Sequence, residues 1–211
     1  MKRVVLPFLF FSMIIASASA QVAYMNITGS LPVLIGRTEV SSTVSTATAT
    51  SAGAMMEIDA RFPGSSISPY FCFGYGFPLA LSSTLNGTAQ TTSIDDYGNG
   101  GSAVVFVGAS YAMNMDKITL SVALAGGMVA LLLPSEAIVN ASGYSSYGPS
   151  LTWMNYGLLV GPSISYALSD SLSLYGTCKA VYAFLKSDTS DAGSVLAFLP
   201  GIGARIKLTQ Q

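Results

Sequence analysis

The chain has 211 residues, of which 51% are hydrophobic and only 9% are charged, with a formal net charge of −1. A soluble domain usually carries about 25% charged residues, so this composition favours a membrane protein or an unusual secreted one. The weak net charge excludes a basic surface for nucleic acid, and the absence of histidine removes the commonest metal ligand and general base.

The first twenty residues have the organisation of a secretory signal peptide. Residues 2–3 are basic, an apolar run covers 4–15, and Ala-Ser-Ala at 18–20 is a small-residue cleavage pattern. The apolar run is short for a membrane span, so we expect cleavage rather than a retained anchor. The mature chain, 21–211, is then a single domain.

Eight segments of alternating hydrophobicity predict β-strands. Successive side chains of a strand point to opposite faces, and each segment has one apolar or aromatic face and one small or polar face. The stretch 37–51 is rich in Ser, Thr and Ala and is either a loop or a polar extension of the two flanking strands. The predicted strands are 22–35, 52–62, 68–81, 102–113, 117–133, 155–167, 172–185 and 194–208.

Segment 117–133 is the best candidate for a membrane helix by hydropathy. If the segment is a strand, however, the apolar Ile118 and Leu120 fall on one face, and the hydroxyls of Thr119 and Ser121 fall on the other. A helix surrounded by lipid gives no reason for two hydroxyls two residues apart among small side chains. The segment therefore favours a strand, and a polytopic helical protein is the weaker alternative.

The connections between the predicted strands alternate between long and short, and aromatic residues gather near the strand ends. Short turns at one end, longer loops at the other and two aromatic girdles are typical of outer-membrane barrels. The girdle candidates are Phe62, Tyr111 and Tyr166 beside the short turns, and Tyr156, Tyr182, Phe184 and Phe198 beside the long loops.

This layout resembles the small eight-stranded outer-membrane barrels of the OmpA membrane-domain, OmpX and OmpW type over the whole mature chain. The resemblance implies an all-β, antiparallel up-and-down transmembrane barrel, located in the outer membrane and surrounded by lipid. It implies loops outside and termini in the periplasm. The oligomeric state stays open with a monomer favoured, and we expect no cofactor. Pro162 and Pro200 fall within predicted strands, where we expect bulges because proline lacks the donor for the ladder.

Charged residues alternate along segment 52–62 and cannot face lipid, where each costs a few kcal/mol near the middle of the bilayer. They must face the lumen, together with charges on the same face of the last two strands. We expect Arg205 to reach Asp59, and Lys179 to lie near Glu57 from the opposite wall. The predicted lumen charges are Glu57, Asp59, Arg61, Lys179, Arg205 and Lys207.

Three functions remain open for such a barrel. An eight-stranded barrel is only wide enough for its side chains to fill, which favours an ion-pair network that plugs the lumen of a structural or environment-contacting protein. The alternative is a small OmpW-like channel for ions or small, including apolar, solutes. A soluble secreted β-protein with an inner apolar core is less favoured. We expect no enzyme, because no histidine or activated nucleophile accompanies Glu57 and Asp59.

The remaining candidates lie on cysteines and loops. Face assignment puts Cys72 inward and Cys178 outward, so we expect two free thiols. The pair at 95–96 is acidic but lacks the spacing of a calcium motif, so we expect no metal. Aromatics among Ser and Gly suit loops that bind extracellular or host ligands, or that join the outer girdle. These loop aromatics are Tyr144, Tyr147 and Trp153.

Overall fold

The computed structural model describes residues 23–41, 44–61, 66–90, 100–133 and 151–208. The predicted signal peptide lies outside these residues. Within them, no helix is long and apolar enough to cross a membrane. The described strands are β1 (Ala23–Ser30), β2 (Val33–Ser41), β3 (Val44–Arg61), β4 (Ile67–Leu85), β5 (Thr88–Gln90), β6 (Gly101–Met115), β7 (Ile118–Leu133), β8 (Leu151–Ala167), β9 (Leu172–Lys186) and β10 (Ser194–Leu208).

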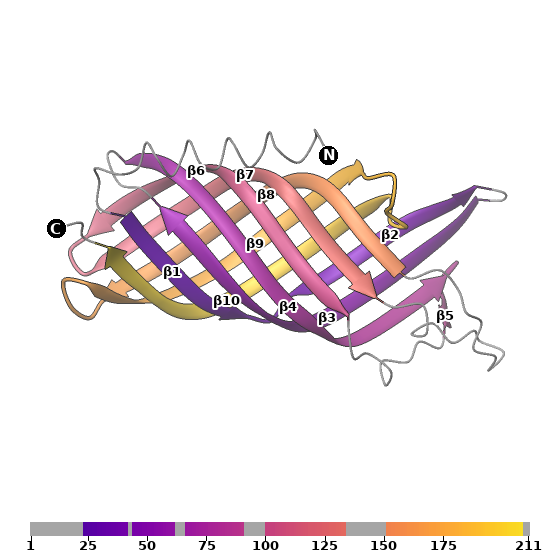
Figure 1. Cartoon of the computed structure of the whole chain (residues 1–211), viewed down its shortest axis with the longest axis horizontal. Coiled ribbons are helices and arrows are strands. Elements are labelled where there is room, and N and C mark those ends of the chain that lie inside the picture. Colours follow the sequence, from indigo (N-terminus) through magenta and orange to yellow (C-terminus); the bar gives the residue numbers. More distant parts are fainter. Residues whose placement is uncertain (1–22, 42–43, 62–65, 91–99, 134–150, 209–211) are drawn as a thin grey trace, which may run out of the picture.

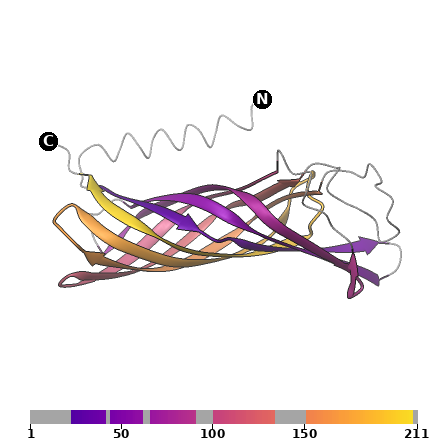
Figure 2. The same ribbon diagram turned by 90° about the horizontal axis from the view of Figure 1, so that it is seen from below.

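The strands form one closed antiparallel ring of eight positions (Figures 1 and 2). β1 and β2 share one position, because both pair with β10 on one side and with β3 on the other. β3, β4, β6, β7, β8, β9 and β10 fill the other seven, and β5 is a short addition to the edge of β4. The predicted eight-stranded up-and-down barrel is confirmed, and the polytopic helical alternative is wrong.

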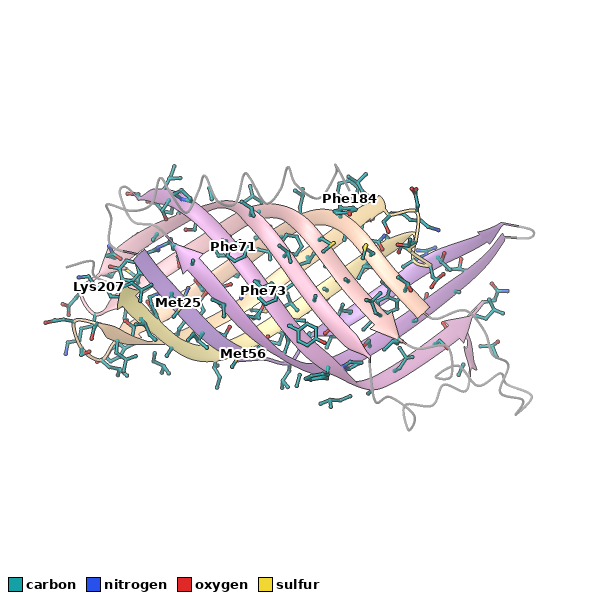
Figure 3. All side chains as sticks on the ribbon, in the orientation of Figure 1. Met25, Met56, Phe71, Phe73, Phe184 and Lys207 are labelled. Atoms are coloured by element: carbon teal, nitrogen blue, oxygen red, sulfur yellow. The ribbon has the colours of Figure 1, made fainter. Side chains whose placement is uncertain are left out.

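The alternation in the sequence decides which side chains enter the ring. In β7, Leu120 and Leu124 are exposed on the outside, while Ala123 and Ala125 are buried inside. The same division holds in β3, where Met56 lies outside and the charged residues lie inside. Figure 3 shows Met56 directed away from the ring. The predicted face assignments are therefore confirmed, and segment 117–133 is a strand.

Residues 37–41 and 44–51 are the predicted polar extension of two strands and not a loop. β2 and β3 remain paired from Val33–Ala52 as far as Ser41–Val44. β10 stops pairing with β2 at Arg37, so β2 and β3 project beyond the ring as a hairpin (Figure 1), and the end of β4 stays paired with β3 as far as Ala47–Leu85. We call this end of the barrel the hairpin end, and the opposite end, with the turns 116–117 and 168–171, the short-turn end.

The bulges expected at Pro162 and Pro200 are wrong. Pro200 pairs with Cys178 in register, and the β8–β9 ladder omits Gly161 and Pro162 but resumes at Ser163–Thr177 without a shift. Each proline still contributes its carbonyl. Pro162 accepts from the Thr177 hydroxyl at 3.1 Å, and Pro200 accepts from the Leu31 amide at 3.0 Å. The register shifts lie instead at Ala52/Gly53 in β3 and at Tyr156/Gly157 in β8.

The core of the protein lies inside the ring and has two halves. The half toward the short-turn end is polar and contains the charged side chains of β3, β9 and β10. The half toward the hairpin end is apolar, and we call it the apolar plug. Its largest members are Leu34, Val129, Leu131, Leu133, Trp153, Leu159, Val181, Val195 and Leu199, each at most 2% exposed.

Candidate functional site: the charge cluster of the lumen

Lys179 joins two carboxylates at the centre of the barrel. Glu57 and Asp59 lie two apart on β3, so both point inward, and Lys179 extends toward them from β9. Its Nζ lies 3.1 Å from Glu57 Oε2 and 3.1 Å from Asp59 Oδ2, with all three side chains at most 1% exposed. Gly161 on β8 gives the lysine room, since a Cβ there would lie 3.2 Å from Lys179 Cγ.

Hydroxyl groups from β1, β4 and β9 surround the two carboxylates. Tyr70 and Tyr175 each donate to Asp59 at 3.3 Å, one to each oxygen. Thr28 donates to Glu57 Oε2 at 3.4 Å. Glu57 Oε1 is buried and has no hydrogen-bond partner among the described residues. Asp59 is therefore satisfied on both oxygens, while Glu57 is satisfied on one.

Arg205 does not make the predicted contact with Asp59. Its Nε donates to Asn26 Oδ1 at 2.8 Å and its Nη1 donates to Ser165 Oγ at 2.7 Å. Asn26 lies on β1, between β10 and β3, and its shorter side chain holds the guanidinium before it reaches the second strand. The guanidinium carbon also lies 4.9 Å from the ring centroid of Tyr175, a cation–π distance.

Arg61 and Lys207 lie nearer the short-turn end and form no ion pair among the described residues. The guanidinium carbon of Arg61 lies 5.3 Å from the ring centroid of Tyr24, and its Nη1 is buried without a hydrogen-bond partner in the described part of the chain. Lys207 is half-buried, at the end of the barrel that is on the left in Figure 3. The six predicted residues therefore divide into an ion triad, Arg205 and a pair of unmatched cations.

Trp153 is predicted to lie in a loop, and this prediction is wrong. The residue lies in β8, points into the ring and is 1% exposed in the apolar plug. The sequence holds a signal for this position, because Trp153, Asn155 and Gly157 continue the inward parity of the strand. Two other loop aromatics, Tyr144 and Tyr147, and the acidic pair 95–96 lie outside the described residues.

The girdle candidates that the structure describes all face outward. Tyr111 and Tyr166 lie toward the short turns, and the others lie toward the hairpin end. Tyr182 and Phe184 are neighbours, with ring centroids 5.7 Å apart. Phe62 lies outside the described residues. Exposed fractions for Tyr111, Tyr156, Tyr166, Tyr182, Phe184 and Phe198 range from 41% to 54%.

The two cysteines are free thiols, as predicted. Cys72 is buried inside the ring, and Cys178 is exposed on the outside. Among the described residues, no three His, Cys, Asp or Glu side chains are grouped as metal ligands. The cluster as a whole offers buried ion pairing and proton-donating hydroxyls, and its triad has no open face on which a substrate would rest.

Comparison with known proteins supports the architecture. No family model and no curated protein matches the sequence. The crystal structure of Neisserial surface protein A (NspA) is similar, with a TM-score of 0.56, 12% identity, and coverage of 88% of this chain and 97% of that one. Ail, the attachment invasion locus protein of Yersinia pestis, gives a TM-score of 0.47, 10% identity and coverage of 88% and 99%.

A major outer membrane protein from Thermus thermophilus gives a TM-score of 0.43, 12% identity and coverage of 89% and 99%. At identities this low, the likeness to NspA is evidence of the fold alone. It agrees with the closed ring of eight positions and with the outward apolar surface described above. The chain has the fold of the small eight-stranded outer-membrane β-barrels.

Proposed function

We propose that this protein is an integral outer-membrane barrel whose lumen is closed and which contacts the surroundings of the cell through its projecting hairpin. The hairpin end faces outward from the cell, and the short-turn end and both termini face the periplasm. The charge cluster of the lumen has a structural role. The single observation that carries the proposal is that buried side chains fill the lumen between its hairpin end and its short-turn mouth, apolar in one half and charged in the other.

Support for a membrane location comes from the outer surface of the ring. Large apolar side chains that a soluble protein would bury are exposed on strand after strand, including Leu124 at 59%, Leu158 at 54% and Leu174 at 59%. The charged side chains Glu57, Asp59, Arg61, Lys179 and Arg205, on β3, β9 and β10, lie inside the ring. Monomeric soluble proteins rarely expose contiguous apolar surface on this scale, whereas a lipid-facing belt requires it.

Support for closure comes from the apolar plug. A channel in the manner of OmpW would need a continuous path past Trp153, Leu131 and Leu199, each at most 1% exposed. On the short-turn side of the plug, Lys179 lies against both carboxylates and forms a second closure, in the polar half of the lumen. Two closures in series favour a structural barrel over a conducting one.

The test of closure is conductance in a planar bilayer. The refolded protein should give no single-channel steps. Replacing Trp153 by alanine should remain silent, because the ion triad still blocks the polar half, and adding Lys179→Ala should produce steps. Each variant must first show heat-modifiable gel migration, the sign of a folded barrel. Regular steps from the unmodified protein would overturn the closed lumen and favour the channel.

The test of location and orientation is thiol labelling of intact cells in a Cys178→Ser background. A cysteine at Thr189, exposed in the connection between β9 and β10 at the hairpin end, should react with a membrane-impermeant maleimide. A cysteine at Lys117, in a short turn, should react only after the outer membrane is opened. Equal labelling of both positions in intact cells would contradict the orientation, and labelling of neither would contradict the outer-membrane location.

A further inference from the structure

The mouth of the lumen at the short-turn end is a cleft with more cations than carboxylates. Its volume is about 220 Å³, and it is lined by side chains from strands around the ring, among them Arg61, Arg205 and Lys207. Among the described residues, the only carboxylate in its wall is that of Asp170, in an exposed turn. This cleft is separate from the ion triad and from the apolar plug.

The carboxylates deeper in the lumen do not neutralise these cations. Glu57 and Asp59 both direct an oxygen to Lys179 at 3.1 Å. Arg205 is held by neutral partners, Asn26 and Ser165. From the triad to the mouth, the cations of the described residues still outnumber the carboxylates. The floor of the cleft therefore carries a net positive charge.

Arg61 is the strongest sign of a ligand. The residue is 8% exposed, it lines the cleft, and its buried Nη1 has no hydrogen-bond partner among the described residues. A buried guanidinium donor that lacks an acceptor is costly, and charge-assisted bonds to an oxyanion are the strongest way to satisfy it. Its contact with the Tyr24 ring, at 5.3 Å, satisfies none of its N–H donors.

We propose that this cleft binds a phosphoryl group, carried by a soluble phosphate ester at the periplasmic mouth of the barrel. Arg61 and Lys207 provide the two positive charges that match a phosphate monoester, which carries about −1.5 to −2 at pH 7. Hydroxyls of Ser171 and Ser173 in the wall are further donors. The cleft opens along the axis of the ring rather than onto its lipid-facing side, which favours a soluble ligand over a lipid headgroup.

The inference is tested by calorimetric titration of the refolded full chain in neutral detergent micelles, with inorganic phosphate and glycerol phosphate as probes in low-chloride buffer. We expect one saturable site. Arg61→Gln should weaken binding at least about tenfold, and Lys207→Gln about threefold. Lys117→Gln is the matched control, since Lys117 lies at the same end of the barrel outside the cleft, and its binding should be unchanged.

Three results would overturn the site. These are no saturable binding to the unmodified protein, equal weakening by Lys117→Gln and Lys207→Gln, and full affinity in a folded Arg61→Gln protein. Lys207→Gln leaves the buried charges intact, so the test survives even if Arg61→Gln fails to fold. Repeating the titration in phosphatidylcholine vesicles with added phosphatidate separates the sources: unchanged affinity supports a soluble ester, and loss of phosphate binding assigns the cleft to a lipid headgroup.

Discussion

Trp153 on β8 lies against Gly36 on β2, on the other side of the lumen. A Cβ built on Gly36 would fall 2.6 Å from Cε2 of the indole, and β9 and β10 separate the two strands in the ring. The indole of Trp153 therefore reaches across the apolar half of the barrel, and it fits there because Gly36 has no side chain. This contact makes the plug a packed core.

The contact predicts that Gly36→Val destabilises the barrel by about 1–3 kcal/mol, because the added methyl groups would overlap the indole ring of Trp153. Urea unfolding in micelles, followed by fluorescence, measures this directly, since Trp153 is the only tryptophan of the chain. Gly29→Val is the control, because a Cβ at Gly29 meets no atom within 4 Å. Equal stability of the two variants would contradict the packing of Trp153 on Gly36.

The ion triad predicts an asymmetry between its members. Lys179→Met leaves two buried carboxylates without a counter-charge and should cost about 3–5 kcal/mol of unfolding free energy. Glu57→Gln should cost much less, because Asp59 still pairs with Lys179 and Glu57 Oε1 has no hydrogen bond within the described residues to lose. The same urea titration measures both variants.

The double variant Lys179→Met with Glu57→Gln supplies the check on this argument. Removing one of the two stranded carboxylates should recover part of the loss, so the double variant should be more stable than Lys179→Met alone. If the two single variants lose equal stability, or if the double variant is no better, then the lysine does not serve as the shared counter-charge.

The architecture was predictable because it depends on parity, that is, on which alternate residues of each strand point inward. The three charges at 57, 59 and 61 can only face inward, and this fixes the lipid face of β3 and, through pairing, of its neighbours. The same reasoning placed Lys179 beside Glu57. Parity says nothing of how far a side chain reaches, so Arg205 was expected at Asp59, whereas Asn26 holds it on the intervening strand.

Strand ends and prolines were the weaker predictions for a related reason. Ser, Thr and Ala alternate weakly in hydropathy, so the projecting part of β2 and β3 was indistinguishable from a loop. Trp153 was different, because its alternation with Asn155 and Gly157 was visible in the sequence but the predicted strand began too late to include it. The effect of Pro200 depended on Leu31, in the break between β1 and β2, whose amide donates to the proline carbonyl. A hydrogen bond between residues so distant in the chain has no signature in the local sequence.

The two thiols predict a labelling pattern that tests the two faces of the wall. Cys178 is exposed on the outside between lipid-facing neighbours, whereas Cys72 is 0% exposed inside the ring. In phosphatidylcholine vesicles, a lipid-soluble maleimide should modify Cys178 and leave Cys72 intact, and mass spectrometry of the digested protein resolves the two sites. After unfolding in urea, both should react. Modification of Cys72 in the folded barrel would mean that the lumen is open to reagents.

Beyond Arg37, where β10 last pairs with β2, the hairpin also contacts the end of β4, through the pair Ala47–Leu85 and the hydrogen bonds between Thr46 and Asn86. Because these contacts lie outside the closed ring, the hairpin should be dispensable for the barrel. Replacing 38–47 by Asn-Gly makes a new two-residue turn between Arg37 and Thr48, which pair with each other in the native ladder. The last native pair is Ser41–Val44, an even number of residues away, so both pairs have the same hydrogen-bonding type and suit the same turn. We expect heat-modifiable migration and an unfolding free energy within about 1 kcal/mol of the unmodified protein.

A deeper excision shows where the barrel itself begins. Joining Val33 to Ala52 uses the same turn and a pair of the same type, but it removes Leu34 from the apolar plug and Gly36 from beneath Trp153. Loss of a buried leucine alone costs about 2–5 kcal/mol, so this variant should be severely destabilised or fail to fold. If the shorter excision is as damaging as the deeper one, the projecting strands support the barrel and the hairpin is not a separable contact surface.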